Sequence, residues 1–79
     1  MRLDKFLKLS RLLKRRAVAN EACDAGRVLV NEKPAKASLA VKAGDMIEIQ
    51  FGIKSVKVEV LDVTETVKKD DAKDLYRYL

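Results

Sequence analysis

The chain has 79 residues, a formal net charge of +5, one cysteine and no histidine. This length allows one domain, near the lower limit of what folds without a disulfide or a metal. A lone Cys23 excludes an internal disulfide and a cysteine zinc site, and the missing histidine removes the commonest general base and metal ligand. There is no apolar run that would span a membrane and no signal-peptide core. We therefore expect a cytoplasmic, monomeric binding protein, not an enzyme, with no cofactor and no metal.

The positive charge is concentrated at the N-terminus. Residues 1–20 carry seven basic groups and one acidic group. Residues 21–50 carry four basic and five acidic groups, and residues 51–79 carry six of each. The densest run is SRLLKRR at residues 10–16. Charge gathered in this way is typical of a surface that binds a polyanion, although a basic run can also be a merely solvated face.

The first helix and the turn after it are predicted from apolar spacing. Leu3, Phe6 and Leu7 stand at i, i+3 and i+4, which predicts a helix over residues 3–10. Residues 11–14 then turn the chain. The side chains expected in the core of the domain include Leu12, Leu13, Val28, Val30, Ile47 and Val58.

The second helix is expected over about residues 15–25, with Gly26 as a left-handed cap after it. Its predicted apolar face is formed by Val18, Ala22 and Ala25, with Cys23 as a further small apolar residue. Arg15 and Arg16 occupy its first turn, at the positive end of the helix dipole, where cations are disfavoured. We infer that these arginines serve a partner outside the helix, so that their removal leaves folding intact.

The middle of the chain reads as strands. Residues 27–31 predict a strand, and Pro34 after it tolerates only an edge or irregular position. A loop with a brief extended piece follows over residues 35–43. Strict alternation over residues 46–51 and 55–61 predicts an antiparallel hairpin. Its core-facing residues are expected to be Ile47, Ile49, Phe51, Val56, Val58 and Val60.

The C-terminal segment is expected to be a linker and a short amphipathic helix over residues 65–79, outside a domain that spans residues 1–64. Asp70 offers an N-cap, Asp71 suits the first helical turn and Arg77 suits the last. Tyr76 and Tyr78 are expected to pack this helix on the sheet, with stacking on RNA bases as the alternative.

A succession of short motifs resembles the S4 RNA-binding domain. These motifs are RLDKFL at residues 2–7, Ser10-Arg11, Arg16-Ala17, GRVLVN at residues 26–31, and VKAGD at residues 41–45 with Ile47. The resemblance covers residues 2–50, and within the family it is strongest to stand-alone RqcP-type factors, relatives of heat-shock protein fifteen. One departure is Glu32, because the wider family has glycine after Asn31.

The resemblance implies an α+β fold in which two short N-terminal helices pack on a small bent, mostly antiparallel sheet, with a short C-terminal helix. It also implies binding to the large ribosomal subunit carrying peptidyl-tRNA, and support for C-terminal alanine tailing of stalled peptides. The implied partners are large-subunit rRNA, the P-site peptidyl-tRNA and the NEMF-family protein RqcH. Recycling of obstructed large subunits, as implied by the likeness to heat-shock protein fifteen, is the alternative within the family.

The candidate RNA-binding residues are the basic side chains of the helix pair and of the loop beside the sheet. They are Arg2, Lys5, Lys8, Arg11, Lys14, Arg15, Arg16, Lys36 and Lys42. Arginine is favoured because its guanidinium gives forked hydrogen bonds to phosphate. Asp4 is expected to orient a neighbouring arginine, since it would repel RNA.

Two other classes of protein remain open at this point. The helix pair permits a helix-turn-helix DNA-binding module in which Asn20 reads adenine. Glu21 and Asp24 on the second helix argue against this, because phosphates would repel them. An adaptor whose basic face meets an acidic protein is the third hypothesis.

Overall fold

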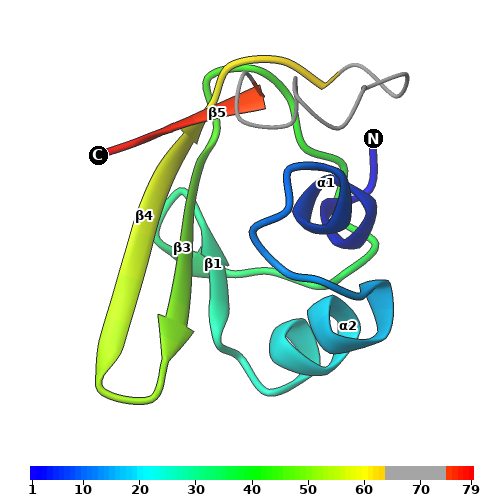
Figure 1. Ribbon diagram of the computed structural model, residues 1–79, viewed down its shortest axis with the longest axis vertical. Coiled ribbons are helices and arrows are strands. Elements are labelled where there is room, and N and C mark those ends of the chain that lie inside the picture. Colours follow the sequence, from blue (N-terminus) through cyan, green and yellow to red (C-terminus); the bar gives the residue numbers. More distant parts are fainter. Residues whose placement is uncertain (64–74) are drawn as a thin grey trace.

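A computed structural model describes residues 1–63 and 75–79. Two helices lie on one side of a five-stranded antiparallel sheet (Figure 1). The elements are α1 (Leu3–Leu9), α2 (Arg16–Asp24), β1 (Val28–Val30), β2 (Lys33–Pro34), β3 (Met46–Phe51), β4 (Lys54–Val60) and β5 (Tyr76–Tyr78). The strand order is β2-β1-β3-β4-β5, so Pro34 lies on an edge strand, as expected.

The start of α1 is fixed by a loop distant in sequence. Arg2, at the N-cap position, makes no side-chain cap hydrogen bond. Instead, the Leu3 N–H donates to the Leu39 carbonyl at 2.8 Å, and the Asp4 N–H donates to the Ala37 carbonyl at 3.1 Å. These bonds satisfy donors that a helix start leaves unpaired. They attach residues 37–40 to the N-terminal end of α1.

The end of α2 has the hydrogen bonds of a Schellman motif. The Arg27 N–H donates to the Ala22 carbonyl at 2.9 Å, and the Gly26 N–H donates to the Cys23 carbonyl at 3.0 Å. Gly26 has a φ of +73°, which confirms the left-handed cap predicted there.

The core lies between the helix pair and one face of the sheet. Phe6, Leu3 and Leu7 from α1 are fully buried against the inward valines and isoleucines of β1, β3 and β4. Five of the six predicted core positions are buried, which are Leu13, Val28, Val30, Ile47 and Val58. Leu12 is only half-buried, so its assignment to the core was wrong. It packs against the cluster from the exposed turn.

Two apolar faces differ from the sequence prediction. In α2 the buried residues are Ala19 and Cys23, whereas Val18 is 43% exposed. The small side chains of Ala19 and Cys23 face the core. The predicted apolar face that begins at Val18 lies to one side of this contact. In β3, Phe51 is the last residue before the hairpin turn and is 44% exposed, and it lines an open hollow together with Val18 and Ala22 of α2.

The predicted C-terminal helix is wrong at its described end. Tyr76–Tyr78 form β5, which pairs antiparallel with β4 and joins Val58 to Tyr78 and Val60 to Tyr76. The alternation of Tyr76 and Tyr78 suits the open edge of β4, whose backbone groups need partners. Asp70 and Asp71 lie outside the described residues. The domain boundary expected after residue 64 stays a prediction.

Candidate nucleic-acid interface

The most constrained polar group in the described structure is the Asp4 carboxylate, which is 1% exposed. Its Oδ2 atom accepts hydrogen bonds from Arg16 Nε at 3.0 Å and from Asn20 Nδ2 at 3.0 Å. Its Oδ1 atom accepts from the Lys5 N–H at 2.8 Å. Arg2 binds the same carboxylate through two hydrogen bonds: its Nε donates to Oδ1 and its Nη2 donates to Oδ2, both at 3.3 Å. Every acceptor position of the buried carboxylate is thus used.

These contacts set the protonation of Asp4. Burial by itself raises the pKa of the carboxyl, because it disfavours the charged form. The hydrogen bonds from Arg16, Asn20 and the Lys5 N–H oppose this effect and outweigh it, so the pKa of Asp4 lies below its usual value. Asp4 is therefore an anion at neutral pH, and it holds two guanidinium groups together.

Arg2 and Arg16 remain available on their outer sides. Their side chains are 53% and 46% exposed, and each uses Nε and Nη2 on Asp4. Neither Nη1 group bonds to any residue in the ranges 1–63 and 75–79, so both keep N–H donors for an external acceptor. Two guanidiniums and one carboxylate leave this cluster at +1. The structure confirms that Asp4 contacts and orients neighbouring arginines.

The contact between Arg16 and Asp4 changes the interpretation of the first turn of α2. The helix dipole disfavours a cation there, but the buried carboxylate of α1 compensates Arg16. Arg16 therefore also joins α1 to α2. Arg15, its exposed neighbour, has no such partner in the described part of the chain.

The turn between the helices presents Arg11 in a strained backbone conformation. Arg11 has a φ of +62°, directly after Ser10, the C-cap residue of α1. This left-handed position is normally filled by glycine, because a side chain there costs about 1 kcal/mol or more. Ser10 itself is buried, and its hydroxyl donates to the Leu7 carbonyl at 3.3 Å. Ser10 is structural, whereas the Arg11 side chain is exposed.

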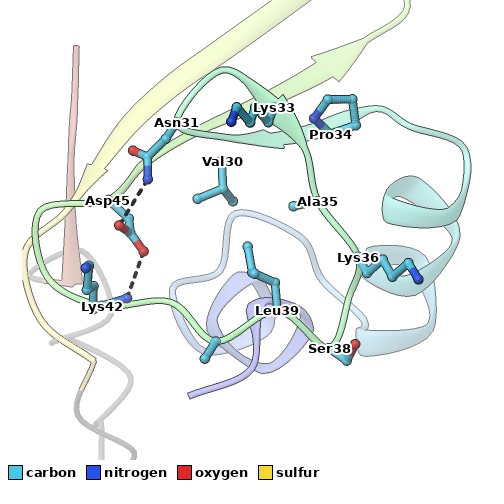
Figure 2. Close-up of a pocket in the computed structure, with 11 residues that line it drawn as sticks. Val30, Asn31, Lys33, Pro34, Ala35, Lys36, Ser38, Leu39, Lys42 and Asp45 are labelled. Carbon is cyan, nitrogen blue, oxygen red and sulfur yellow. Dashed lines mark hydrogen bonds between the residues drawn. The ribbon is translucent and has the colours of Figure 1, made fainter.

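The remaining candidates surround this cluster at different distances. Lys5 and Lys8 lie on α1, and Lys14 lies in the turn before α2. Lys36 directly precedes Ala37, the residue that is bonded to the start of α1. Lys42 lies further along the same loop, where its backbone N–H donates to the Asp45 carboxylate (Figure 2). The structure thus brings Arg2 and Arg16 together on the Asp4 carboxylate, while Lys36 and Lys42 both line a neighbouring hollow.

The outward face of the sheet is balanced in charge. Glu48 pairs with Lys57, with 3.6 Å between Oε1 and Nζ, and Glu59 pairs with Arg77, with 2.6 Å between Oε1 and Nη2. Because these strands carry paired charges, the surplus of positive charge lies on the helix side.

Asn20 is the residue whose role the sequence did not predict. Its Nδ2 atom donates to Asp4 Oδ2 and to the Arg16 carbonyl, both at 3.0 Å. The spacing of Arg16 and Asn20, four apart on one helix, was the available signal. An amide engaged in this way is not free to read adenine, which removes the main support for the helix-turn-helix hypothesis.

Other chemistry finds little support among the described residues. Burial, with the nearby charges of Asp4 and Asp24, raises the pKa of the Cys23 thiol, and Cys23 lies in the core as a small apolar residue of α2. Within residues 1–63 and 75–79, no group of three or more acidic, cysteine or histidine side chains is arranged to hold a metal ion. No helix in these ranges has the length and apolar character to cross a membrane.

Comparison with known proteins decides the family. The S4 domain profile matches residues 1–47, more than half of the chain. The chain is a member of the S4 domain family. The fold of this S4 protein is similar to the trimeric structure of heat shock protein 15 from Vibrio cholerae, with a TM-score of 0.90 and 29% identity, covering 100% of this chain and 81% of that one. The solution structure of the hypothetical protein HP1423 gives a TM-score of 0.84 and 34% identity, covering 100% and 96%.

Sequence relatives of this S4 protein include two named RQC P-site tRNA stabilizing factor. The protein from Halalkalibacterium halodurans is 57% identical over 76 residues, covering 96% of this chain and 86% of the relative. The protein from Bacillus subtilis is 51% identical over 79 residues, covering 100% and 92%. These names agree with the resemblance to RqcP-type quality-control factors.

Proposed function

We propose that this chain is an RNA-binding factor without catalytic activity, which associates in the cytoplasm with the large ribosomal subunit carrying peptidyl-tRNA. It contacts large-subunit rRNA and the P-site tRNA. The observation that supports this most strongly is the buried Asp4, which holds two half-exposed arginines on the helix pair of an S4 domain. Relatives that are more than half identical carry the name RQC P-site tRNA stabilizing factor, which supports the ribosomal target.

The chemistry of the helix pair fits phosphate recognition. Structured RNA presents phosphate and 2′-hydroxyl surfaces, and its deep major groove is closed to side chains. The guanidinium groups of Arg2 and Arg16 are held in place by Asp4 before RNA binds, so little side-chain entropy is lost on phosphate binding. Around them we assign supporting phosphate contacts to Lys5, Lys8, Arg11, Lys14, Arg15, Lys36 and Lys42.

The finer part of the proposal concerns the pathway. We assign to the chain support of C-terminal alanine tailing by the NEMF-family protein RqcH on stalled large subunits. The factor holds tRNA and rRNA in place and forms no covalent intermediate. Recycling of obstructed subunits, which the resemblance to heat-shock protein fifteen implies, is the second candidate.

Gradient sedimentation tests the proposal. Lysate from cells with stalled translation is separated, and the chain is followed across the subunit and ribosome fractions. We expect co-migration with the large subunit and release by high salt or by nuclease. Absence from ribosomal fractions contradicts the proposal, and retention after complete nuclease digestion favours the adaptor hypothesis.

A second experiment separates the two pathways. Stalled subunits from cells that lack this chain are supplied with RqcH, alanyl-tRNA and either the purified chain or buffer. If the chain acts in tailing, added alanines per nascent peptide increase with it. If it acts only in recycling, peptide length is unchanged while the fraction of obstructed subunits falls.

A further inference from the structure

A hollow of about 740 Å³ lies beside the helix pair, between the hairpin of β1 and β2 and the loop at residues 35–45. Figure 2 shows Val30, Ala35 and Leu39 in its middle. This volume lies within the usual range for small-ligand sites, about 300–1,000 Å³. Leu39 is 41% exposed, a large apolar side chain left open to solvent at the centre of the hollow.

The rim of this hollow is basic. Lys33, Lys36 and Lys42 are exposed and stand around it on different sides (Figure 2). The acidic side chain among the lining residues is Asp45, which is 6% exposed. Its carboxylate accepts from Asn31 Nδ2 at 3.2 Å and from the Lys42 N–H at 3.0 Å, so it serves to join the loop to the hairpin. The lining carries three cations and one anion, a net charge of +2.

The hollow is continuous with the proposed RNA surface. The backbone that forms its lower wall is also the backbone that binds the start of α1, through the Leu3–Leu39 and Asp4–Ala37 hydrogen bonds. An antiparallel bridge between Arg2 and Ala40 adds a third connection. A chain of phosphates that leaves Arg2 therefore reaches Lys36 without crossing an acidic surface side chain of this loop.

We propose that the hollow binds one unstacked nucleotide of the RNA that the helix pair contacts. The inference rests on the proposed function and extends it to the kind of RNA feature recognised. Proteins that recognise folded RNA commonly bind unstacked bases in its loops and bulges. The base lies on Leu39 and the apolar floor, and its two flanking phosphates lie at the rim, within reach of the flexible lysine side chains. A ligand with a flat apolar body between anionic groups matches both the apolar floor and the basic rim. An acidic peptide would match the basic rim but has no flat apolar group for the floor.

Titration of the isotopically labelled full chain, followed by amide NMR, tests the site directly. The probes are 5′-AMP and 5′-UMP, with ribose 5-phosphate and hexaglutamate as controls. We expect the nucleotides to shift the amides of Ala35, Leu39 and Ala40 in a saturable manner, while ribose 5-phosphate and hexaglutamate leave these three unmoved. Equal shifts with ribose 5-phosphate or hexaglutamate, or no saturable shift at the floor, overturn the proposal.

A pair of variants connects the site to the ribosome. Leu39→Asp places a carboxylate at the centre of the hollow, and Ile53→Asp places one on a fully exposed turn between β3 and β4. Leu39→Asp is expected to lose the nucleotide shifts and to weaken large-subunit binding roughly fivefold, the low end for one base contact. Ile53→Asp binds as wild type at moderate salt, where distant charges are screened.

The outcomes separate this inference from the proposed function. If Leu39→Asp is folded and binds the large subunit as well as Ile53→Asp does, the nucleotide site is wrong while the proposed function stands. If the wild type itself does not bind the large subunit, the proposed function fails. The NMR titration still decides whether the hollow takes nucleotides, even where Leu39→Asp does not fold.

Discussion

Arg16 Nε lies 3.0 Å from Asp4 Oδ2, and this contact joins the two helices across twelve positions of sequence. From the helix dipole alone, Arg16→Ala is expected to leave the fold intact. With the contact known, the opposite follows, because the substitution leaves a buried carboxylate with fewer donors. We expect Arg16→Ala to lower the free energy of unfolding by about 1–3 kcal/mol and also to weaken RNA binding. Urea denaturation measures the first effect and large-subunit binding the second.

Arg15→Ala is the matched control for Arg16→Ala. Arg15 is exposed and has no ion pair in the described part of the chain, so its removal should change stability by less than about 0.5 kcal/mol. It should still weaken RNA binding if the first turn of α2 meets phosphate. Equal stability of the two variants would show that the contact between Arg16 and Asp4 contributes nothing to folding.

Asp4 makes stability depend on pH in a predictable direction. Its pKa is lower in the folded chain than its usual value, so the ionised form stabilises the fold above the unfolded pKa of about 3.9. That stabilisation is lost as the pH falls from there through the lower folded pKa. Asp4→Asn should therefore be less stable than wild type by about 1–3 kcal/mol at pH 7. The difference should shrink below pH 4 in denaturation curves, and a constant difference from pH 7 to pH 3 contradicts the assignment.

Glycine substitutions at two residues with positive φ distinguish the effect of backbone strain on stability from the effect of the side chain on RNA binding. Arg11 has a φ of +62° and Glu32 a φ of +72°, and glycine adopts either conformation without a steric penalty. Arg11→Gly and Glu32→Gly should each stabilise the fold by up to about 1 kcal/mol. Only Arg11→Gly should weaken large-subunit binding, because Arg11 lies in the basic turn and Glu32 is an anion. Thermal melting and a binding titration distinguish the two, and equal binding by both variants removes Arg11 from the RNA surface.

Salt dependence reports the number of phosphate contacts. With about six cationic contacts, affinity for a ribosomal RNA fragment should fall by about 10³ between 50 and 200 mM salt. Arg15→Ala should lower the slope of log affinity against log salt by about one. Lys54→Ala, at the start of β4, should leave that slope unchanged. A flat response of the wild type would leave the basic helix pair without a role.

Val58→Asp should unfold the chain. Val58 is 1% exposed and lies in the sheet between Ile47 and Tyr78. An unpaired carboxylate there costs several kcal/mol, comparable with the whole stability of a small domain. Circular dichroism should show no cooperative melt. Ser55→Asp, which puts the same charge at an exposed position of β4, should melt as the wild type does.

The sequence by itself determined the basic helix pair, the left-handed cap at Gly26, the hairpin of β3 and β4, and the family. These features depend on local spacing, on one residue's backbone freedom, or on alternation along a strand, all of which are written in consecutive positions. The edge position of Pro34 followed in the same way, because a residue without an N–H donor is excluded from the middle of a sheet.

Tertiary structure alone decided the features that depend on partners distant in sequence. The sequence predicted that Asp4 orients an arginine, but the burial of Asp4 beneath Arg2, Arg16 and Asn20 needs α1 and α2 to be packed together, and no local pattern predicts it. The strand at Tyr76–Tyr78 depends on an open edge of β4, which overrides the helical preference suggested by nearby charges. The hollow around Leu39 exists because residues 37–40 are held against α1 by backbone hydrogen bonds, and such bonds leave no pattern in the side chains.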